Sequence, residues 1–202
     1  MTKVMTASKP MTDGQIENVV NKLRDALRKH RSEFSSEPVQ QVLGVENLGM
    51  ELMAPFRQRV EAVSNMITRR AKVNRTRNAQ VAIDATGRRQ YTDKDVVDAM
   101  PNGEGEEVEV VFFNLGRYVS DTDLDKEYEL RGLKPADPFS LAAVNEVDPA
   151  FADQKPNATH WKDSNGKWCY AAFYQWYGER LVYALRHVSG WVGGWWFAGL
   201  RK

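Results

Sequence analysis

Cysteine and long hydrophobic runs are both scarce in this chain of 202 residues. The single cysteine, Cys169, excludes a disulfide within the chain and favours a reducing compartment. No run approaches the roughly 18 apolar residues of a membrane-spanning helix. The first residues contain no apolar segment typical of a secretory signal. We therefore expect a cytoplasmic protein with no membrane partner.

The chain also lacks an excess of charge of either sign. Its 28 Lys and Arg residues nearly balance 27 Asp and Glu, which leaves a formal net charge of +1 at pH 7. A nearly neutral chain has no global electrostatic attraction for nucleic acid, so nucleic acid is not the expected partner. The length suits one domain, or one domain with a smaller helical one.

Motifs typical of catalysis and of metal binding are missing. No Cys/His spacing suits zinc, and there is no phosphate-binding glycine loop or nucleophile elbow. Asp121, Asp123 and Asp125 resemble the start of a calcium loop, but Lys126 stands where that loop requires glycine. Cys169 lies in an apolar strand pattern, which favours a buried hydrophobe over a nucleophile. We expect neither an enzyme nor a cofactor.

The N-terminal half is predicted to be helical. Thr12 followed by Gln15 is a capping-box pattern, and the segment after it carries apolar residues at helical spacing. A second helical pattern runs from 48 to 67, in which Pro55 favours a break near Ala54. Because each helix has an apolar face, we expect the two to pack on each other. The first apolar stripe consists of Ile16, Val19, Val20, Leu23 and Leu27.

Residues near position 104 that favour a flexible joint predict a boundary between two units of the chain. Residues 1–11 are polar and patternless and are expected to form a mobile tail, followed by a helical N-terminal region over 12–103. The joint over 102–105 precedes a β-branched and aromatic run of strand length over 108–113. We therefore expect the second unit to cover residues 104–202.

The second unit combines a helix with several short strands. Acidic residues begin a predicted helix over 121–130, and the sequence Asp-Ser-Asn-Gly over 163–166 is a strong hairpin turn. Strands are predicted over 168–174, 180–186 and 195–200. This order of elements indicates an α+β fold.

Basic residues concentrate over 69–89, and two interpretations of them are open. They could form a nucleic-acid contact surface, which is the alternative function that we retain. They could equally occupy the solvated end of a helix, where the dipole favours cations. No aromatic residue is interleaved among Arg69–Arg89, which favours the second interpretation. The basic residues are Arg69, Arg70, Lys72, Arg75, Arg77, Arg88 and Arg89.

All six tryptophans lie between Trp161 and Trp196. Tryptophan buries a large apolar surface and keeps one N–H to satisfy, so the cluster builds either a core or a binding face. Alternate residues of a strand over 180–186 point to opposite faces, and Val182 and Ala184 share one of them. The opposite face mixes leucine, tyrosine and histidine, which suits a contact surface better than a core. Its residues are Leu181, Tyr183, Leu185 and His187.

One pattern of residues spans the C-terminal part of the chain. Residues 168–173 read Trp-Cys-Tyr-Ala-Ala-Phe, then come Trp176, Arg180 and Trp191, and the chain closes on 195–202. This pattern resembles the variable proteins of diversity-generating retroelements. In that family a reverse transcriptase copies a template repeat with errors at adenines, and the copy replaces the end of the target gene. The enzyme acts on the gene, not necessarily on the protein.

The resemblance implies a C-type lectin fold for the second unit, preceded by the helical region. A variable segment over about 170–202 would form an exposed ligand-binding surface on a fixed scaffold. The same fold hosts formylglycine-generating enzymes, which by resemblance use a cysteine pair, so the lone Cys169 counts against that activity. The implied scaffold residues are Trp168, Trp176, Arg180, Trp191, Trp195 and Trp196.

The family's mechanism restricts which residues can vary. Replacement of adenines in the asparagine codons AAC and AAT reaches Tyr, His, Asp, Ser, Gly, Val, Leu and Phe, but not Trp, Lys, Glu, Gln or Met. The resemblance therefore implies a ligand-binding display protein, with another protein as the expected ligand. The suspected variable positions, all within the reachable set, are Tyr174, Tyr177, Gly178, Leu181, Tyr183, Leu185, His187, Val188, Ser189, Gly190, Val192, Gly193 and Gly194.

Overall fold

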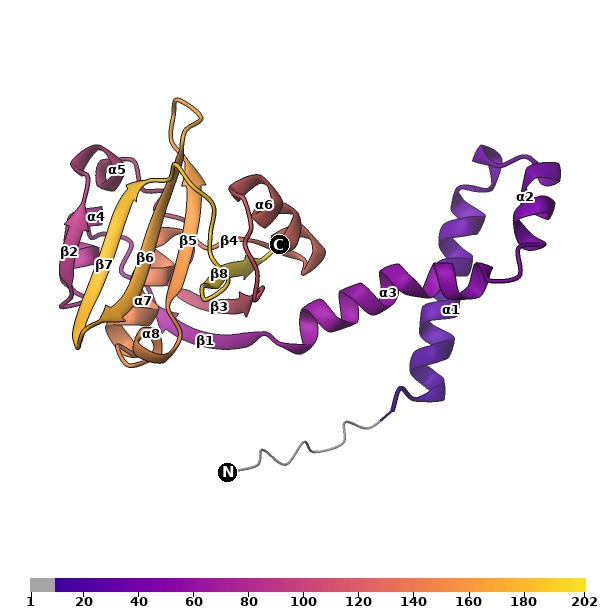
Figure 1. Cartoon of the computed structure of the whole chain (residues 1–202), viewed down its shortest axis with the longest axis horizontal. Coiled ribbons are helices and arrows are strands. Elements are labelled where there is room, and N and C mark those ends of the chain that lie inside the picture. The colour runs from indigo at the N-terminus through magenta and orange to yellow at the C-terminus, as the bar shows by residue number, and fades with distance from the viewer. Residues whose placement is uncertain (1–9) are drawn as a thin grey trace. The chain divides into compact units, whose positions relative to one another are not determined.

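The computed structural model describes residues 10–202 and divides into two compact units, one ending at Pro55 and the other covering Phe56–Lys202 (Figure 1). Most of the tail expected over 1–11 lies outside the described residues. Helices precede an eight-stranded sheet, so the class is α+β as expected. No helix in the described part of the chain is both long and apolar enough to span a membrane.

The first part of the chain is entirely helical. Thr12 caps the first helix in the expected capping box: its side chain accepts from the Gln15 N–H, and the Gln15 side chain accepts from the Thr12 N–H. The last of these helices continues through Pro55 without the expected break. The elements are α1 (Asp13–Lys29), the short 3₁₀ helix η1 (Arg31–Glu33), α2 (Ser36–Leu43) and α3 (Leu48–Ser64).

None of the residues in these four helical elements is buried. Ile16 and Leu27, which mark the two ends of the apolar stripe on α1, are 44% and 55% exposed. The expectation that the two long helices bury their apolar faces against each other is therefore wrong for the single chain. Within the unit that ends at Pro55, no described element covers the stripe on α1.

Residues Ile67–Lys72 form strand β1, whereas the sequence pattern predicted that the second helix extends to Ile67. Side chains of β1 alternate between inward and outward positions, with Ala71 buried, and the strand pairs antiparallel with β3 (Glu107–Asn114). Strand β2 (Arg89–Thr92) pairs parallel with β7 (Glu179–Arg186). The boundary expected at residue 104 therefore falls inside the sheet unit, and the all-helical part ends at Ser64.

The strands of the sheet follow the order β1-β3-β8-β5-β6-β7-β2, and β4 pairs with β8 at the side. The predicted strands after residue 107 are all present, and the hairpin turn over 163–166 joins β5 to β6 as expected. The remaining strands are β3 (Glu107–Asn114), β4 (Leu133–Pro135), β5 (Asn157–Lys162), β6 (Trp168–Trp176), β7 (Glu179–Arg186) and β8 (Trp196–Arg201).

Helices cover the two faces of the sheet unequally. Four helices pack on one face, around a core that includes Phe112 and Phe173. The other face carries a second core around Phe113 and Phe197, covered by one helix and by the loop between β7 and β8. The first four are α4 (Ala79–Asp84), α5 (Lys94–Asp98), α7 (Pro138–Val147) and α8 (Phe151–Gln154), and the single helix is α6 (Asp121–Leu130).

Candidate ligand-binding face

The β6–β7 hairpin positions six of the thirteen residues that were expected to vary. The two strands pair antiparallel along their full length. Tyr177 and Gly178 form the turn with φ of 46° and 82°, the left-handed conformation that a type I′ turn requires. The turn fixes the register, which places Tyr174, Leu181 and Tyr183 on the face that carries the second core.

Aromatic rings follow one another across this face. Tyr91 of β2 stacks on Tyr183 with ring centroids 5.0 Å apart, and Tyr174 lies 5.4 Å from Tyr183. Trp195 meets Tyr174 edge-on at 5.7 Å and Trp191 at 5.8 Å. We call these five residues the aromatic row. Each such contact contributes about 0.5–1.5 kcal/mol beyond area burial, so the rings hold one another in position.

Exposure varies along this face. Tyr91 is 39% exposed, Tyr183 and Leu185 are half-buried, and Trp191 is buried. Leu181 is only 5% exposed, because it lies in the register between residues of β2 and β6 with longer side chains. The expectation that Leu181 contacts a ligand is therefore corrected: it is a covered residue of the scaffold.

The loop over 187–195 returns across the same face. Val119 and Trp191 form an isolated antiparallel bridge with N···O distances of 3.0 and 2.8 Å, which fixes the middle of the loop. Val188 and Val192 project outward and are 96% and 64% exposed. Ser189, Gly194 and the turn residues Tyr177 and Gly178 are also exposed.

Two glycines that were expected to vary touch the segment over 116–118. A Cβ on Gly193 would lie 2.7 Å from the carbonyl carbon of Gly116 and 2.8 Å from the Arg117 nitrogen, both of them backbone atoms. A Cβ on Gly190 would overlap the Tyr118 ring, an exposed side chain that can move aside. Gly193 therefore serves the scaffold, and its assignment as a variable contact is corrected.

A buried carboxylate joins the loop to the start of α6. Asp121 Oδ1 accepts hydrogen bonds from His160 Nδ1 at 2.7 Å and from Trp191 Nε1 at 2.9 Å, and Oδ2 accepts from His187 Nδ1 at 2.6 Å. The His160 side chain is fully buried, and that of His187 is 8% exposed. We call these four residues the Asp121 cluster. His187, expected as an exposed contact, instead supports the loop from inside.

Burial and hydrogen bonding oppose each other in this cluster. Burial alone would raise the pKa of Asp121, but the bonds from His160, His187 and Trp191 outweigh it and hold the pKa below 3.8. Burial alone would lower the pKa of His160, but Asp121 and Asp125 outweigh it and raise the pKa above 6.5. His160 Nε2 lies 3.1 Å from Asp125 Oδ1 without hydrogen-bond alignment, so that contact is an ion pair.

The tryptophans assigned to the scaffold differ in burial. Trp191 is buried, and Trp195 and Trp196 are half-buried against the sheet. Trp176 is 61% exposed, because it stands at the end of β6 beside the turn. Its scaffold assignment is therefore corrected: Trp176 belongs to the accessible surface at the hairpin tip.

Two further scaffold residues make specific contacts. Arg180 donates from Nε and Nη2 to Asp153 Oδ2 at 3.0 and 2.6 Å, which ties β7 to the end of α8. Trp168 stacks on His160 with ring centroids 4.6 Å apart. Both contacts hold the hairpin against neighbouring elements, as the scaffold interpretation requires.

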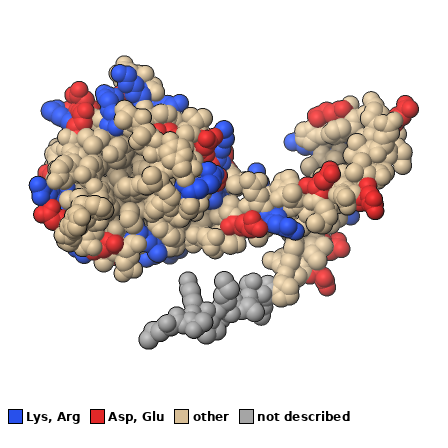
Figure 2. All heavy atoms as spheres, viewed as in Figure 1, with Lys and Arg blue, Asp and Glu red and all other residues tan. Residues whose placement is uncertain are grey.

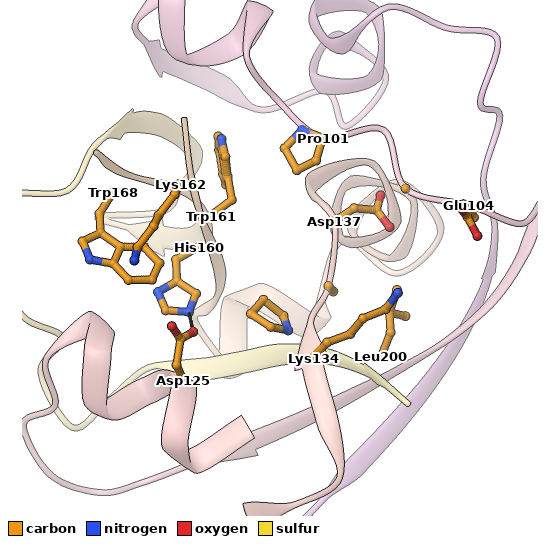
Figure 3. Close-up of a pocket in the computed structure, with 13 residues that line it drawn as sticks. Pro101, Glu104, Asp125, Lys134, Asp137, His160, Trp161, Lys162, Trp168 and Leu200 are labelled. Carbon is orange, nitrogen blue, oxygen red and sulfur yellow. Dashed lines mark ion pairs between the residues drawn. The ribbon is translucent and has the colours of Figure 1, made fainter. Parts of the chain in front are cut away.

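A cleft of about 470 Å³ opens beside β4 and the end of β5 (Figure 3). His160 and Asp125 face each other there, and Trp168 lies next to them. Two of the ionisable groups at the cleft are already engaged, since His160 pairs with two carboxylates and Asp137 binds Arg75 at 2.6 Å. No three His, Cys, Asp or Glu side chains among residues 10–202 are arranged to hold a metal ion.

The basic residues over 69–89 are paired rather than gathered into a surface. Arg88 is buried and donates to the carbonyl oxygens of Tyr174 and Pro149. Figure 2 shows basic and acidic side chains interspersed around the sheet unit. Each of these basic side chains thus lies next to an acidic or carbonyl oxygen. The other pairs are Arg69–Asp148, Arg70–Glu109, Lys72–Glu107, Arg75–Asp137, Arg77–Glu146 and Arg89–Glu179.

Comparison of the chain with protein-family models, with curated proteins and with solved structures gives no match. The face is therefore interpreted from the residues of this chain alone.

Sequence reasoning missed several residues that build this face. In the sequence, Asp121 indicated the start of a helix. No residue near it in the chain predicted its contacts with His160 or Trp191. Tyr91 lies outside the segment that carries the resemblance, and reaches the face only because β2 pairs with β7. Both contributions arise from long-range pairing.

We expect Asp121→Asn to lower the free energy of unfolding by about 3 kcal/mol, since it removes one partner of a buried ion pair. Chemical denaturation followed by tryptophan fluorescence measures the change. Asp123→Asn, in the same turn of α6 but exposed, is the matched control and should change stability much less. Equal losses in the two variants would show that the helix start, not the cluster, carries the effect.

Stability should also depend on pH through the same cluster. The pKa of Asp121 is lowered by folding, so its contribution is complete above about pH 4 and is lost as pH falls through the folded value. The pKa of His160 is raised, so its contribution is complete below about pH 6.5 and is lost as pH rises through the folded value. Urea unfolding across this range should show a smaller alkaline loss in His160→Gln than in the wild type. An unchanged alkaline loss would contradict a charged His160.

Two neighbouring glycines should respond differently to the same substitution. Gly193→Ser places a side chain against backbone atoms and should cost about 2 kcal/mol of unfolding free energy. Gly194→Ser meets no atom within 4 Å and should change stability by less than about 0.5 kcal/mol. Thermal and chemical denaturation of both variants measure this difference. Similar costs at both positions would refute the scaffold role of Gly193.

Proposed function

We propose that the sheet unit is a ligand-binding display domain of the C-type lectin class, whose accessible face is diversified by adenine-directed copying of its gene. The alternation along β7 carries this proposal. Tyr183 and Leu185 are half-exposed on the face with the aromatic row, whereas Val182 and Ala184 are fully buried on the other. One face of β7 thus contributes side chains to the core, and its other face contributes side chains that can change without altering that core.

The positions that remain accessible support the genetic part of the proposal. Each can arise from an asparagine codon by replacement of adenines, whereas Trp191 and Trp195 of the loop cannot. A change at Val188 or Val192 leaves the contacts of these tryptophans in place, whereas a change at Tyr174 removes one ring contact with Trp195. The accessible positions are Tyr174, Tyr177, Gly178, Tyr183, Leu185, Val188, Ser189, Gly190, Val192 and Gly194.

The character of the face favours a protein ligand. None of the ten accessible positions carries a charged side chain. Tyrosines such as Tyr174 and Tyr183 supply rigid, amphipathic contact area at low entropic cost. Aromatic enrichment and depletion of charge are typical of the centre of a protein interface, which buries about 800 Å² per partner.

A display selection tests the proposal. A library would randomise Tyr174, Tyr183, Leu185, Val188 and Val192, with the full chain displayed on phage and lysozyme as the target. We expect most clones to fold and some to bind lysozyme, because the changed side chains do not fill the core. Folding is read from protease resistance, and binding from titration of purified clones.

A control library would randomise Ala171, Phe173, Val182 and Ala184, which alternate with the first set and are buried. Most of its clones should lose protease resistance. Equal loss in the two libraries would contradict a changeable face, and folded clones without any binder would contradict the binding function. Sequencing of the flanking DNA tests the genetic part: a repeat of the segment encoding 170–202, differing at adenines, should lie beside a reverse transcriptase gene.

A further inference from the structure

Helix α1 presents an apolar stripe to solvent along its whole length. Ile16, Val20, Leu23 and Leu27 are each between 44% and 55% exposed. Three of them line a shallow groove of about 480 Å³ that also includes Arg24. The 17 residues of α1 form a helix about 25 Å long, and an amphipathic helix of this size depends on a partner for its stability.

The spacing of the stripe is that of a coiled-coil seam. The steps from Ile16 to Val20, Leu23 and Leu27 are four, three and four residues, which assigns them to alternating d and a positions of the heptad. In an antiparallel pair of such helices, each a residue packs against a d residue of the partner. Ile16 then meets Leu27 of the second copy, and Val20 meets Leu23 of the second copy.

The residues beside the seam decide the direction of pairing. In this antiparallel register the flanking e positions face each other, so Glu17 meets Arg24 of the second copy, twice by symmetry. The g positions also face each other, so the apolar Val19 meets Ala26 of the second copy. The e positions are therefore complementary in charge across the interface, and the g positions bring two apolar side chains together.

A parallel pair lacks this complementarity. There each g position faces the e position five residues further along the other helix. Val19 would then meet Arg24, and Thr12 would meet Glu17. Neither pair joins opposite charges or two apolar groups, so the sequence of α1 disfavours that arrangement.

We infer that α1 of one chain pairs antiparallel with α1 of a second copy, so that the protein is a homodimer. Two heptads alone make a marginal coiled coil, but α2 and α3 add further exposed apolar side chains next in the chain. Burial of these residues supplies the apolar area that the single chain leaves in water. They are Val39, Val42, Leu43, Met50, Leu52 and Met53.

The first measurement is the mass of the full chain by light scattering, at about 100 µM and on dilution. We expect twice the mass of one chain. Leu23→Asp places a carboxylate in the seam and should give a monomer. Asn18→Asp introduces the same residue on the opposite side of α1 and should remain a dimer. A monomeric wild type, or equal loss in both variants, would overturn the inference.

A charge exchange separates association from folding of the helix. Glu17→Arg alone and Arg24→Glu alone each create two like-charge contacts and should raise the dissociation constant by at least about tenfold. The double variant restores opposite charges across the antiparallel interface and should recover most of the wild-type affinity. Because residues 17 and 24 do not face each other in a parallel pair, absence of recovery would overturn the antiparallel assignment.

Cross-linking reads the direction directly, since Cys169 is buried and is the chain's only cysteine. Chains carrying Ile16→Cys and Leu27→Cys would be mixed and oxidised. The antiparallel pair predicts a disulfide between the two different variants. Disulfides only between identical variants would show a parallel pair and overturn the assignment.

Discussion

The Asp121 carboxylate is the group on which the candidate ligand-binding face depends. It accepts hydrogen bonds from β5, through His160, and from two residues of the loop over 187–195. Without it, the buried imidazole of His160 would face a single carboxylate, and the Trp191 N–H would lose its acceptor. The position of the loop relative to the sheet thus depends on the buried Asp121 carboxylate together with the backbone bridge between Val119 and Trp191.

The Asp121 cluster can retain most of its hydrogen bonds when an adjacent position of the loop is substituted. Two of the donors to Asp121 come from His160 and Trp191, neither of which belongs to the accessible surface. Only the third donor, His187, lies at a position that the adenine mechanism could alter. A substitution there removes at most one of three hydrogen bonds, and the carboxylate keeps its charged partner. The Asp121 cluster therefore keeps two of its three hydrogen bonds whatever residue stands at position 187.

Local signals predicted local structure well. The capping box at Thr12, the helix over 121–130 and the turn over 163–166 all depend on residues within a few positions of each other, and all are present. The alternation along β7 also separated core from surface, apart from the buried Leu181. Each of these patterns is complete within one short segment, so the sequence alone contains the information.

Long-range pairing limited the rest of the prediction. The helical apolar spacing placed Ile67 in the second helix, whereas Ile67–Lys72 pairs with β3 as a strand at the edge of the sheet. The basic residues then looked like a helix end, whereas their carboxylate partners come from β3, α7 and other distant segments. The contact between Gly193 and Gly116 could not be predicted from the sequence either. A glycine required by close backbone packing cannot be distinguished, in a single sequence, from a glycine at a variable position.

The two halves of the chain make opposite use of apolar residues. The sheet unit buries its aromatic and aliphatic side chains in two cores, and in the proposed function its accessible face is the part that changes. The helical elements leave apolar residues exposed, which the proposed second copy would cover. A dimer would place two identical faces on one particle, and the second binding event would then occur at a raised effective concentration. A randomly diversified surface would bind most targets weakly. Bivalent binding would therefore increase the fraction of sequence variants that retain a ligand.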